Sequence, residues 1–305
     1  MNFDLEGKNS GFAFAISAAI ISGVSVFLNK SAVASFNPFE FTGMKNLVVA
    51  LLMLAGLLLC ARGTELRSLS RKDWRNLVLI GLVGGSVPFL LFFWGLSHAN
   101  AADASLLQKS LFIPAGALAF VFLKERLSFK QLAATGLLFI GATLFSGLDF
   151  AALGTPEYAI LAAVLLWSVE DVISKRVLSS LSPAVVVFGR MFFGSLAIFA
   201  FLGATGQVPD VIAFSANQWL WLSLTSLFLL GYNWAFYSGL QKLKVGETTG
   251  ILLLGSVVTT ALSFSAGTAP KPLELLGAVA VLAGVGAIVA FAKTEKSELR
   301  SPAPA

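Results

Sequence analysis

The stretch "LNKSAVASFNPFEFTGMKN", residues 28–46, decides the fold of this chain, because its pattern returns later in the sequence. The copy is "ISKRVLSSLSPAVVVFGRM", residues 173–191, at a constant offset of 145. Three aligned pairs carry the match: Lys30 with Lys175, Pro38 with Pro183 and Lys45 with Arg190. We interpret the two stretches as equivalent parts of two related structural units.

The composition around these stretches indicates an integral membrane protein. Only 12% of the 305 residues are charged, 57% are hydrophobic and the mean hydropathy is +0.85. A soluble protein of this size carries about 25% charged residues. The net charge of +5 does not point to nucleic acid, because the basic residues form no stripe with aromatic side chains. One cysteine, one histidine and no Cys-x-x-Cys motif give no sign of a metal centre.

Apolar segments long enough to cross a bilayer recur throughout the chain. A helix needs about 20 apolar residues for this. The segment "LVVALLMLAGLLLC", residues 47–60, does not alternate as a barrel strand would, so helices are expected. The predicted spans are 11–34, 39–61, 75–97, 101–123, 130–148, 157–178, 183–204, 217–240, 246–266 and 272–292. The first span lacks a basic leader and a cleavage site, so we expect it to be retained.

A second alignment divides the ten spans into two units of five. "WGLSHANAADAS", residues 94–105, matches "SGLQKLKVGETT", residues 238–249, at an offset of 144. Because five is odd, the second unit must enter the membrane from the opposite side. This predicts an all-α membrane protein of ten transmembrane helices in two inverted five-helix repeats, as in many secondary transporters. The expected divisions are an N-terminal segment 1–10, repeats 11–148 and 157–292, a linker 149–156 and a disordered tail 293–305.

The distribution of basic residues predicts the orientation. If the N-terminus lies in the cytoplasm, the inner segments hold most of the 21 basic residues and the outer loops only Lys271. The inner set is Lys8, Arg62, Arg67, Arg71, Lys72, Arg75, Lys124, Arg126, Lys130, Lys175, Arg176, Lys242, Lys244, Lys293, Lys296 and Arg300. Cytoplasmic loops are enriched in Lys and Arg. We therefore expect a multi-pass protein of the inner (plasma) membrane with both termini cytoplasmic.

One long stretch resembles a known family. "GLSHANAADASLLQKSLFIPAGALAFVFLKERLSFKQLAATGLLFIGATLF", residues 95–145, is similar to the EamA-type members of the drug/metabolite transporter superfamily. The resemblance rests on Gly95-Leu96, the mid-helix Pro114 and the turn "LKERLS" with Glu125, and it extends over about residues 11–292. The second repeat departs from it, because "SAGTAPKPLELLG" lacks the acid of the turn. The resemblance implies ten spans and transport of amino acids, small metabolites or hydrophobic drugs without ATP.

Charged residues that are expected deep in the bilayer form the candidate site. Lys109 in "LLQKSLFIP" is expected about 12 Å from its helix start, near the bilayer centre. A lysine there costs roughly 2.5–3.5 kcal/mol, so it is expected to face the bundle interior. Glu170 and Asp171 lie at a similar depth. Each of these charged residues has two interpretations. It contacts a substrate or a proton, or it belongs to a structural ion pair, such as one between Glu170 and Arg190.

Other residues complete the prediction. Lys45 and Arg190 lie about 10 Å inside their helices toward opposite faces, which suits two gates or two structural anchors. Lys30 and Lys175 are expected to snorkel, and Asp103 and Glu247 to cap helices. The segment "LLGYNWAFYSGL", residues 229–240, combines rings with polar groups and suggests a pocket. The candidate lining residues in it are Tyr232, Asn233, Trp234 and Tyr237, although packing alone is the alternative.

These features predict a secondary active transporter of a small amphipathic solute, an amino acid or related metabolite, working by alternating access. Lys109 would meet a carboxylate, and Glu170 or Asp171 an ammonium or a coupling proton. The alternatives are efflux of lipophilic cations, exchange of phosphorylated metabolites, and a scaffold or receptor that transports nothing. An enzyme is not expected, because His98 has no obvious partner, and no cofactor is implied. The oligomeric state is open.

Overall fold

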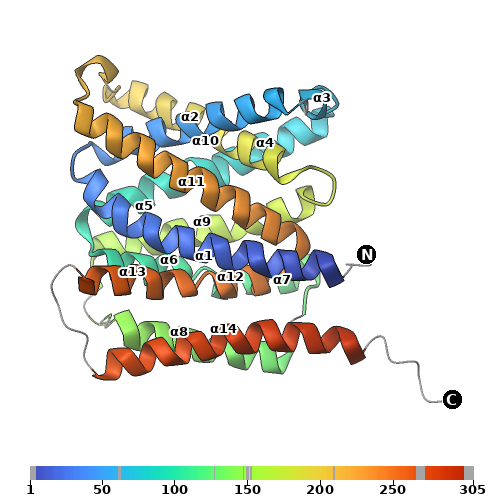
Figure 1. Cartoon of the computed structure of the whole chain (residues 1–305). Coiled ribbons are helices and arrows are strands. Elements are labelled where there is room, and N and C mark those ends of the chain that lie inside the picture. The colour runs from blue at the N-terminus through green and yellow to red at the C-terminus, as the bar shows by residue number, and fades with distance from the viewer. Residues whose placement is uncertain are drawn as a thin grey trace.

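The computed structural model describes residues 5–60, 63–126, 128–146, 148, 151, 153–208, 210–265 and 272–298. Within these ranges the chain is helical apart from short connections, and no strand is present. The helices run side by side in one bundle (Figure 1). The predicted linker and C-terminal tail lie partly outside the described residues.

The first half contains one short helix and five spans, two of which are broken. The spans are α1 (Leu5–Val33), α2 (Pro38–Leu59), α4 (Arg71–Gly85) with α5 (Val87–His98), α6 (Ala101–Lys109) with α7 (Phe112–Leu123), and α8 (Phe129–Ser146). The short helix α3 (Gly63–Arg67) joins α2 to α4. Asn37 caps the start of α2, because its side chain accepts the Phe39 N–H and proline follows it.

The second half repeats this order. It comprises α9 (Thr155–Val177), α10 (Pro183–Thr205), α11 (Ala216–Lys242), α12 (Val245–Ile251) with α13 (Leu254–Ser265), and α14 (Pro272–Glu298), with a single turn at Val211–Ala213. The predicted disordered tail is wrong up to Glu298, because α14 continues to that residue. Its "KTEKSE" sequence favours helix, which explains the extension.

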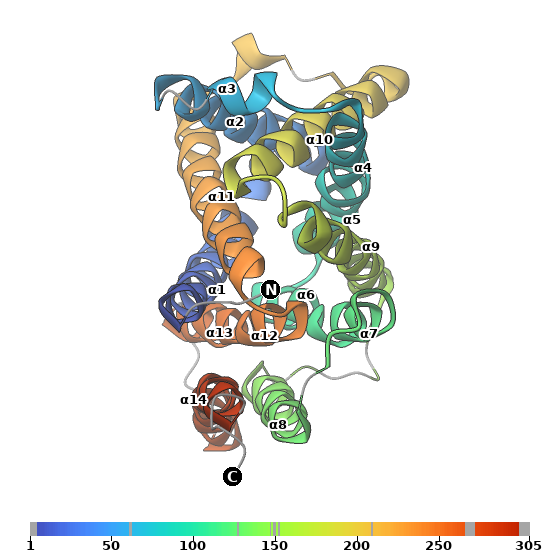
Figure 2. The same cartoon turned by 90° about the vertical axis from the view of Figure 1, so that its right-hand side faces the viewer.

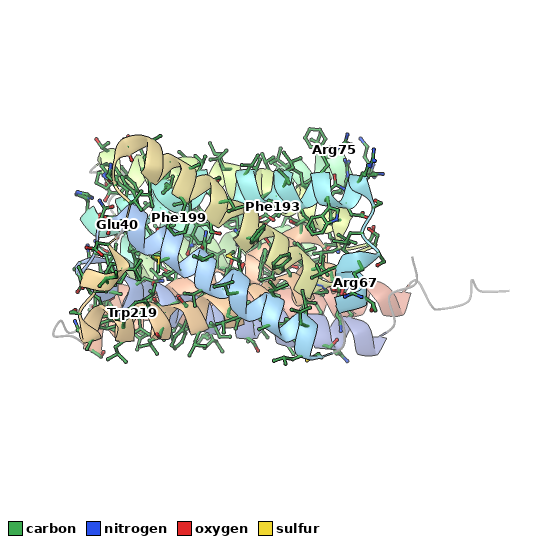
Figure 3. All side chains as sticks on the ribbon, turned by 90° about the horizontal axis from the view of Figure 1, so that it is seen from above. Glu40, Arg67, Arg75, Phe193, Phe199 and Trp219 are labelled. Carbon is green, nitrogen blue, oxygen red and sulfur yellow. The ribbon has the colours of Figure 1, made fainter. Side chains whose placement is uncertain are left out.

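Among the described residues, six helical segments are long and apolar enough to cross a membrane. They are Gly7–Val33, Pro38–Leu59, Arg71–His98, Ala101–Leu123, Pro183–Thr205 and Val245–Ser265. Two shorter apolar segments, Phe129–Phe145 and Leu275–Phe291, belong to α8 and α14. Figure 3 shows the division along the helices: Arg67 and Arg75 lie at one end, Glu40 and Trp219 at the other, and Phe193 and Phe199 between them. The predicted fold class is confirmed.

The packing of the helices reveals the inverted repeat. α1 and α9, the first helices of the two units, run in opposite directions (Figure 1). α1 packs on α11 as α9 packs on α5, whereas α2 pairs with its own counterpart α10 and α8 with α14 (Figure 2). At the α4–α10 crossing, a Cβ on Gly85 would stand 2.2 Å from the Arg190 carbonyl oxygen. Only glycine allows this approach of the two backbones.

Two aligned lysines make equivalent contacts in the two units. The Lys30 ammonium donates to the Leu96 and Ser97 carbonyl oxygens at 3.0 Å, at the end of α5. The Lys175 ammonium donates to the Leu240 carbonyl at 2.7 Å, at the end of α11. These lysines therefore cap helix C-termini instead of snorkelling, because the terminal carbonyls carry partial negative charge. Glu247 caps α12 as predicted, through its 3.1 Å bond from the Lys244 N–H.

Candidate functional site

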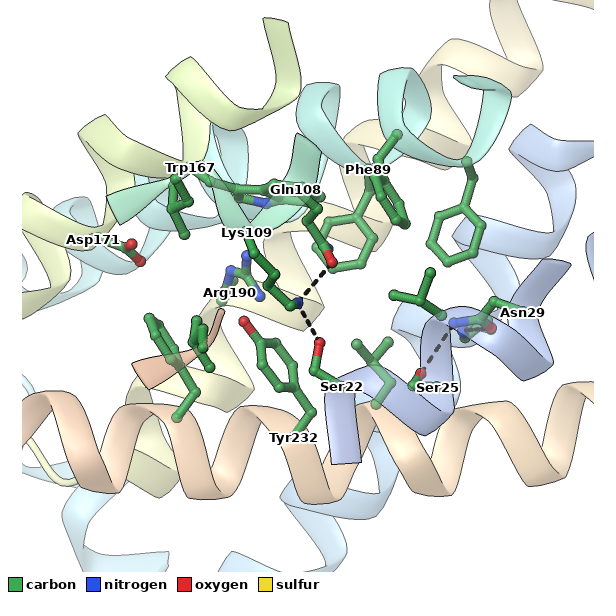
Figure 4. A pocket seen from close by; sticks show the side chains of 18 residues that line it. Ser22, Ser25, Asn29, Phe89, Gln108, Lys109, Trp167, Asp171, Arg190 and Tyr232 are labelled. Atoms are coloured by element: carbon green, nitrogen blue, oxygen red, sulfur yellow. Dashed lines mark hydrogen bonds between the residues drawn. The ribbon is translucent and has the colours of Figure 1, made fainter. Parts of the chain in front are cut away.

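Lys109 is buried at the point where its span is broken. It is the last residue of α6, and Ser110 and Leu111 separate it from α7. The side chain is 2% exposed, so it faces the bundle interior as predicted. Its ammonium donates to the Ser22 hydroxyl at 2.5 Å and to the Gln108 side-chain oxygen at 2.8 Å (Figure 4). The Tyr232 ring centroid lies 5.8 Å away, within cation–π range.

The partners of Lys109 are all neutral groups. Within the described residues, no carboxylate oxygen lies within 4 Å of its ammonium. Its repeat counterpart in α12–α13 is Leu253, which is fully buried, so the second break carries no such charge. The positive charge of Lys109 is therefore solvated by hydroxyl, amide and aromatic groups.

Glu170, by contrast, has an ion-pair partner and two hydrogen-bond donors. Its carboxylate forms an ion pair with the Arg190 Nε at 3.4 Å and accepts hydrogen bonds from the Tyr237 hydroxyl at 2.7 Å and from the Ser174 hydroxyl. The side chain has no exposed surface. The arrangement agrees with the structural interpretation of Glu170 as the partner of Arg190.

Arg190 links this network to α11. One guanidinium nitrogen donates to the Asn233 side-chain oxygen at 2.7 Å, and the group lies over the Phe89 ring at 5.1 Å. Asn233 in turn donates to the Leu229 carbonyl at 2.7 Å. Arg190 thus joins α9, α10 and α11 around one buried polar centre, a role that its planar, always charged head group suits.

Asp171 follows Glu170 in sequence and has a different environment. It is 2% exposed, and its Oδ2 atom has no hydrogen-bond partner. In the part of the chain that the structure describes, no cationic nitrogen lies within 4 Å of this carboxylate. Because adjacent helical residues differ in direction by about 100°, Glu170 points toward α4 and Asp171 lines the cavity. A buried acid without a partner is costly and needs an explanation.

Lys45 supplies a third buried cation. Its ammonium donates to the Asn29 side-chain oxygen at 2.6 Å, and Asn29 donates to the Ser25 hydroxyl at 3.0 Å. The Phe41 and Phe93 rings lie 4.9 and 4.8 Å from it. Lys45 and Arg190 line the same cavity, which differs from the expectation of two gates at opposite ends. Lys45 and Arg190 each lie only about 10 Å along the helix from its first residue. Their long side chains span the remaining distance to the centre of the bundle.

These charges surround a single cavity near the middle of the bundle. In the view of Figure 4, Asp171 and Asn29 lie at opposite ends, with Lys109 and Arg190 between them. The walls are aromatic and come from Phe89, Phe92, Trp167, Tyr232 and Phe236. The space open to water centres is about 50 Å³, whereas small-molecule sites span roughly 300–1,000 Å³. In this conformation the cavity has room for a few water molecules only.

The structure brings some predicted residues together and separates others. Lys109, Asp171 and Tyr232 line the cavity together with Lys45 and Arg190. Asn233 and Tyr237 are buried behind it, where they hold Arg190 and Glu170. Trp234 is 41% exposed on the outside of the bundle, so it does not line the predicted pocket.

Sequence reasoning missed the contribution of α1. Ser22, Ser25 and Asn29 all line the cavity. Their spacing of three and four residues places them on one face of a helix that is otherwise apolar. Such a polar stripe within a predicted span is the signal that could have identified them.

The comparisons with known proteins agree with this architecture. The model of the EamA-like transporter family matches the chain twice, over residues 9–147 and 155–290. The chain belongs to the EamA-like transporter family. The two matches correspond to the two five-helix units of the inverted repeat.

Individual members of the EamA-like family are distant relatives of this chain. "Uncharacterized transporter YyaM" of Bacillus subtilis is 23% identical over 275 residues, which cover 88% of this chain and 89% of the relative. "Probable terminal-alkyne amino-acid exporter" of Streptantibioticus cattleyicolor is 28% identical over 218 residues, which cover 70% and 72%. One solved crystal structure, 20% identical, covers 95% of this chain and 99% of its own with a TM-score of 0.72, which supports the fold. The family and these names identify a membrane transporter rather than an enzyme.

Proposed function

We propose that this EamA-like transporter carries a small zwitterionic solute, an amino acid or related metabolite, by secondary active transport. One observation supports the proposal most directly: Lys109 and Asp171 line one buried cavity, and both lack an ion-pair partner among the described side chains. A solute with a carboxylate and an ammonium supplies the two missing partners. Uncompensated charges inside a membrane protein characteristically mark such a path.

The walls of the cavity fit the rest of such a solute. Phe92, Trp167 and Phe236 offer apolar contact, and the Tyr232 ring adds a face for an ammonium group. The cavity of about 50 Å³ is too small for an amino acid, so binding requires the helices around it to separate. The conformation described is therefore an occluded state in this proposal.

Alternating access follows from the inverted repeat. The two five-helix units exchange conformations around the pseudo-two-fold axis, and each exchange opens the cavity to one compartment. The helix breaks after Lys109 and Ile251 lie in corresponding spans and give the two units matching points of bending. Asp171 is also the group that we assign to a coupling proton when no ammonium occupies the site.

The orientation is part of the proposal. α1 begins and α14 ends at the same end of the bundle, and Arg67 and Arg75 lie at that end (Figures 1 and 3). Because basic loops favour the cytoplasm, this end faces inward and both termini are cytoplasmic in a cell inner membrane. The relative named as an amino-acid exporter favours export as the physiological direction.

The decisive experiment is flux in proteoliposomes across a panel of amino acids and related metabolites. Lys109→Ala and Asp171→Asn should each lower flux of the transported solute by more than about tenfold, since each removes a charge contact. The matched control is Lys72→Gln, which removes an exposed charge at the end of α4. Wild-type flux in both cavity variants would refute the assignment.

A second candidate is exchange of an anionic, phosphorylated metabolite. It is favoured by the three cations, Lys45, Lys109 and Arg190, that line one cavity. The two candidates differ in their need for Asp171. Asp171→Asn abolishes transport of a zwitterion, but it preserves or increases transport of an anion because it removes a repelling charge. Efflux of lipophilic cations has less support, because the carboxylate of Glu170 is occupied by Arg190 and Tyr237.

A further inference from the structure

A large groove on the described part of the bundle lies between α7 and α8, away from the polar centre. Its volume is about 650 Å³, and large apolar side chains around it, such as Ile113, Phe120 and Leu132, are exposed on the outside of the bundle. Its walls are mainly apolar and are formed by Phe112, Ile113, Gly116, Ala117, Phe120, Leu132, Thr135 and Gly136. Figure 2 shows α7 and α8 standing apart, with α8 and α14 forming a separate layer. This layer contacts the rest of the bundle mainly through α6, α12 and α13.

Small residues keep the groove open. A Cβ on Gly116 of α7 or on Gly136 of α8 would meet no atom within 4 Å. These two glycines therefore face free space, unlike the glycines at helix crossings. Ile113, Phe120 and Leu132 are at least half exposed around them. An apolar groove of this length and exposure in a membrane span fits a hydrocarbon chain.

One end of the groove is basic. The turn after α7 places Lys124 in the left-handed region, with φ of 58°, and the two residues that follow it line the groove. Arg126 lines the groove, and its carbonyl oxygen accepts a 2.8 Å hydrogen bond from Lys244. Arg176 donates to the Phe122 carbonyl from the neighbouring helix. Arg126 and the adjacent Lys244 therefore stand where the apolar walls end, whereas Arg176 lines a separate hollow between α7 and α9.

The acid of the same turn, Glu125, also lines the groove, but its carboxylate is bonded to the protein. The Glu125 carboxylate accepts the Val245 N–H at 2.7 Å and thereby caps the start of α12. Burial also raises the pKa of Glu125 above its ordinary value, while the Val245 N–H bond and Lys175 oppose the shift. The Glu125 carboxylate is engaged in this contact within the protein, whereas the Arg126 side chain is exposed.

We propose that this groove binds one anionic phospholipid, with an acyl chain between α7 and α8 and its phosphate at Arg126. Charge complementarity selects the occupant, because an apolar channel that ends in basic groups matches a hydrocarbon chain that ends in a phosphate. The lipid fills the gap that separates the α8–α14 layer from the remainder of the bundle. The site is independent of the polar cavity and of the solute transported there.

The test is native mass spectrometry and thermal stability of the full chain in detergent with added phosphatidylglycerol, phosphatidylethanolamine or phosphatidylcholine. One molecule of phosphatidylglycerol should bind to each protein chain, with an affinity about fivefold or more higher than that of the other two lipids. Arg126→Gln should remove this preference, and Gly136→Leu should remove the bound lipid by filling the groove. Lys72→Gln, which removes an exposed cation elsewhere, should change neither.

Two results would overturn the proposal. One is equal affinity of the wild-type chain for the three lipids. The other is a Gly136→Leu variant that still binds one lipid molecule as the wild-type chain does. If the Gly136→Leu variant does not fold, the Gly116→Leu variant serves for the same test, because it fills the groove from α7. Competition between a transported solute and the lipid for this groove would identify the groove as a solute path and would also contradict the proposal.

Discussion

Arg190 on α10 and Glu170 on α9 form a buried ion pair at 3.4 Å, and this pair leaves the neighbouring Asp171 without a partner. Two carboxylates adjacent in sequence therefore have different tasks. Glu170 holds three helices together, whereas Asp171 has a carboxyl oxygen that no described side chain satisfies.

Removing one member of the pair is expected to destabilise the protein. Arg190→Ala leaves Glu170 buried without its cation, which costs about 3–5 kcal/mol. The measurement is the thermal midpoint of the detergent-solubilised chain, with Arg67→Ala as the exposed control. A midpoint equal to that of Arg67→Ala would show that the pair has no structural role.

The position of Glu170 depends on a glycine opposite it. A Cβ on Gly84 would stand 2.2 Å from the Glu170 Cγ. Gly84→Ala should therefore destabilise by about 1–3 kcal/mol through overpacking. Gly56→Ala, whose Cβ meets nothing within 4 Å, is the matched control and should stabilise by roughly 0.5–1 kcal/mol as an ordinary helix substitution. Equal effects of the two substitutions would contradict the packing described.

Lys124 is the one residue other than glycine with positive φ among the described residues, at 58°. Lys124→Gly should stabilise the fold by about 0.5–1 kcal/mol, because glycine adopts this conformation without the Cβ penalty. Lys130→Gly in the first turn of α8 should instead destabilise. Thermal midpoints of the two variants decide the matter, and a lower midpoint for Lys124→Gly would show that its side chain contributes a contact.

Lys45 should be replaceable by an apolar side chain without loss of the fold. Among the described residues, its ammonium contacts the Asn29 side-chain oxygen and two aromatic rings, and replacing a buried cation with methionine is often neutral or stabilising. Asn29→Ala should cost about 1–3 kcal/mol, because it leaves the Lys45 ammonium without its acceptor. Measuring both midpoints tests this, and Lys45→Met should rescue Asn29→Ala in the double variant.

Glu125 predicts a pH dependence of stability. Burial raises its pKa, so the folded chain binds this proton more tightly than the unfolded chain does. The contribution is therefore fully present below the unfolded pKa, near 4.5, and is lost as the pH rises through the raised folded value. Glu125→Gln should flatten this decline between acidic and neutral pH. Midpoints that fall in parallel for both proteins would assign the decline to other groups.

The single cysteine offers a test of orientation. Cys60 is exposed and follows α2, at the end that carries α3. A membrane-impermeant maleimide should label it in inside-out vesicles and not in intact cells. Cys60→Ser with Ser215→Cys, which moves the thiol to the opposite end, should reverse the pattern. Labelling of Cys60 from outside intact cells would invert the proposed topology.

Much of the architecture could be predicted from the sequence, because hydropathy and the repeat offset depend on residues that act locally. The choice of partners could not. The pairing of Glu170 with Arg190 depends on how α9 is rotated against Gly84, which no spacing within α9 specifies. The break after Ile251 was also missed, since no proline or glycine pair marks it. The groove between α7 and α8 has no sequence signal, because it exists only where two helices fail to touch.

The layer of α8 and α14 has a consequence for biosynthesis. Gly141 and Gly277 interlock the two helices, with a Cβ on Gly277 only 2.5 Å from the Gly141 carbonyl oxygen. α14 leaves the ribosome after every other described helix, so α8 has this surface unpaired in the membrane until α14 has been synthesised. Chain termination before α14 would therefore leave a finished first half with an unpaired helix face, a form that cellular quality control should recognise and degrade.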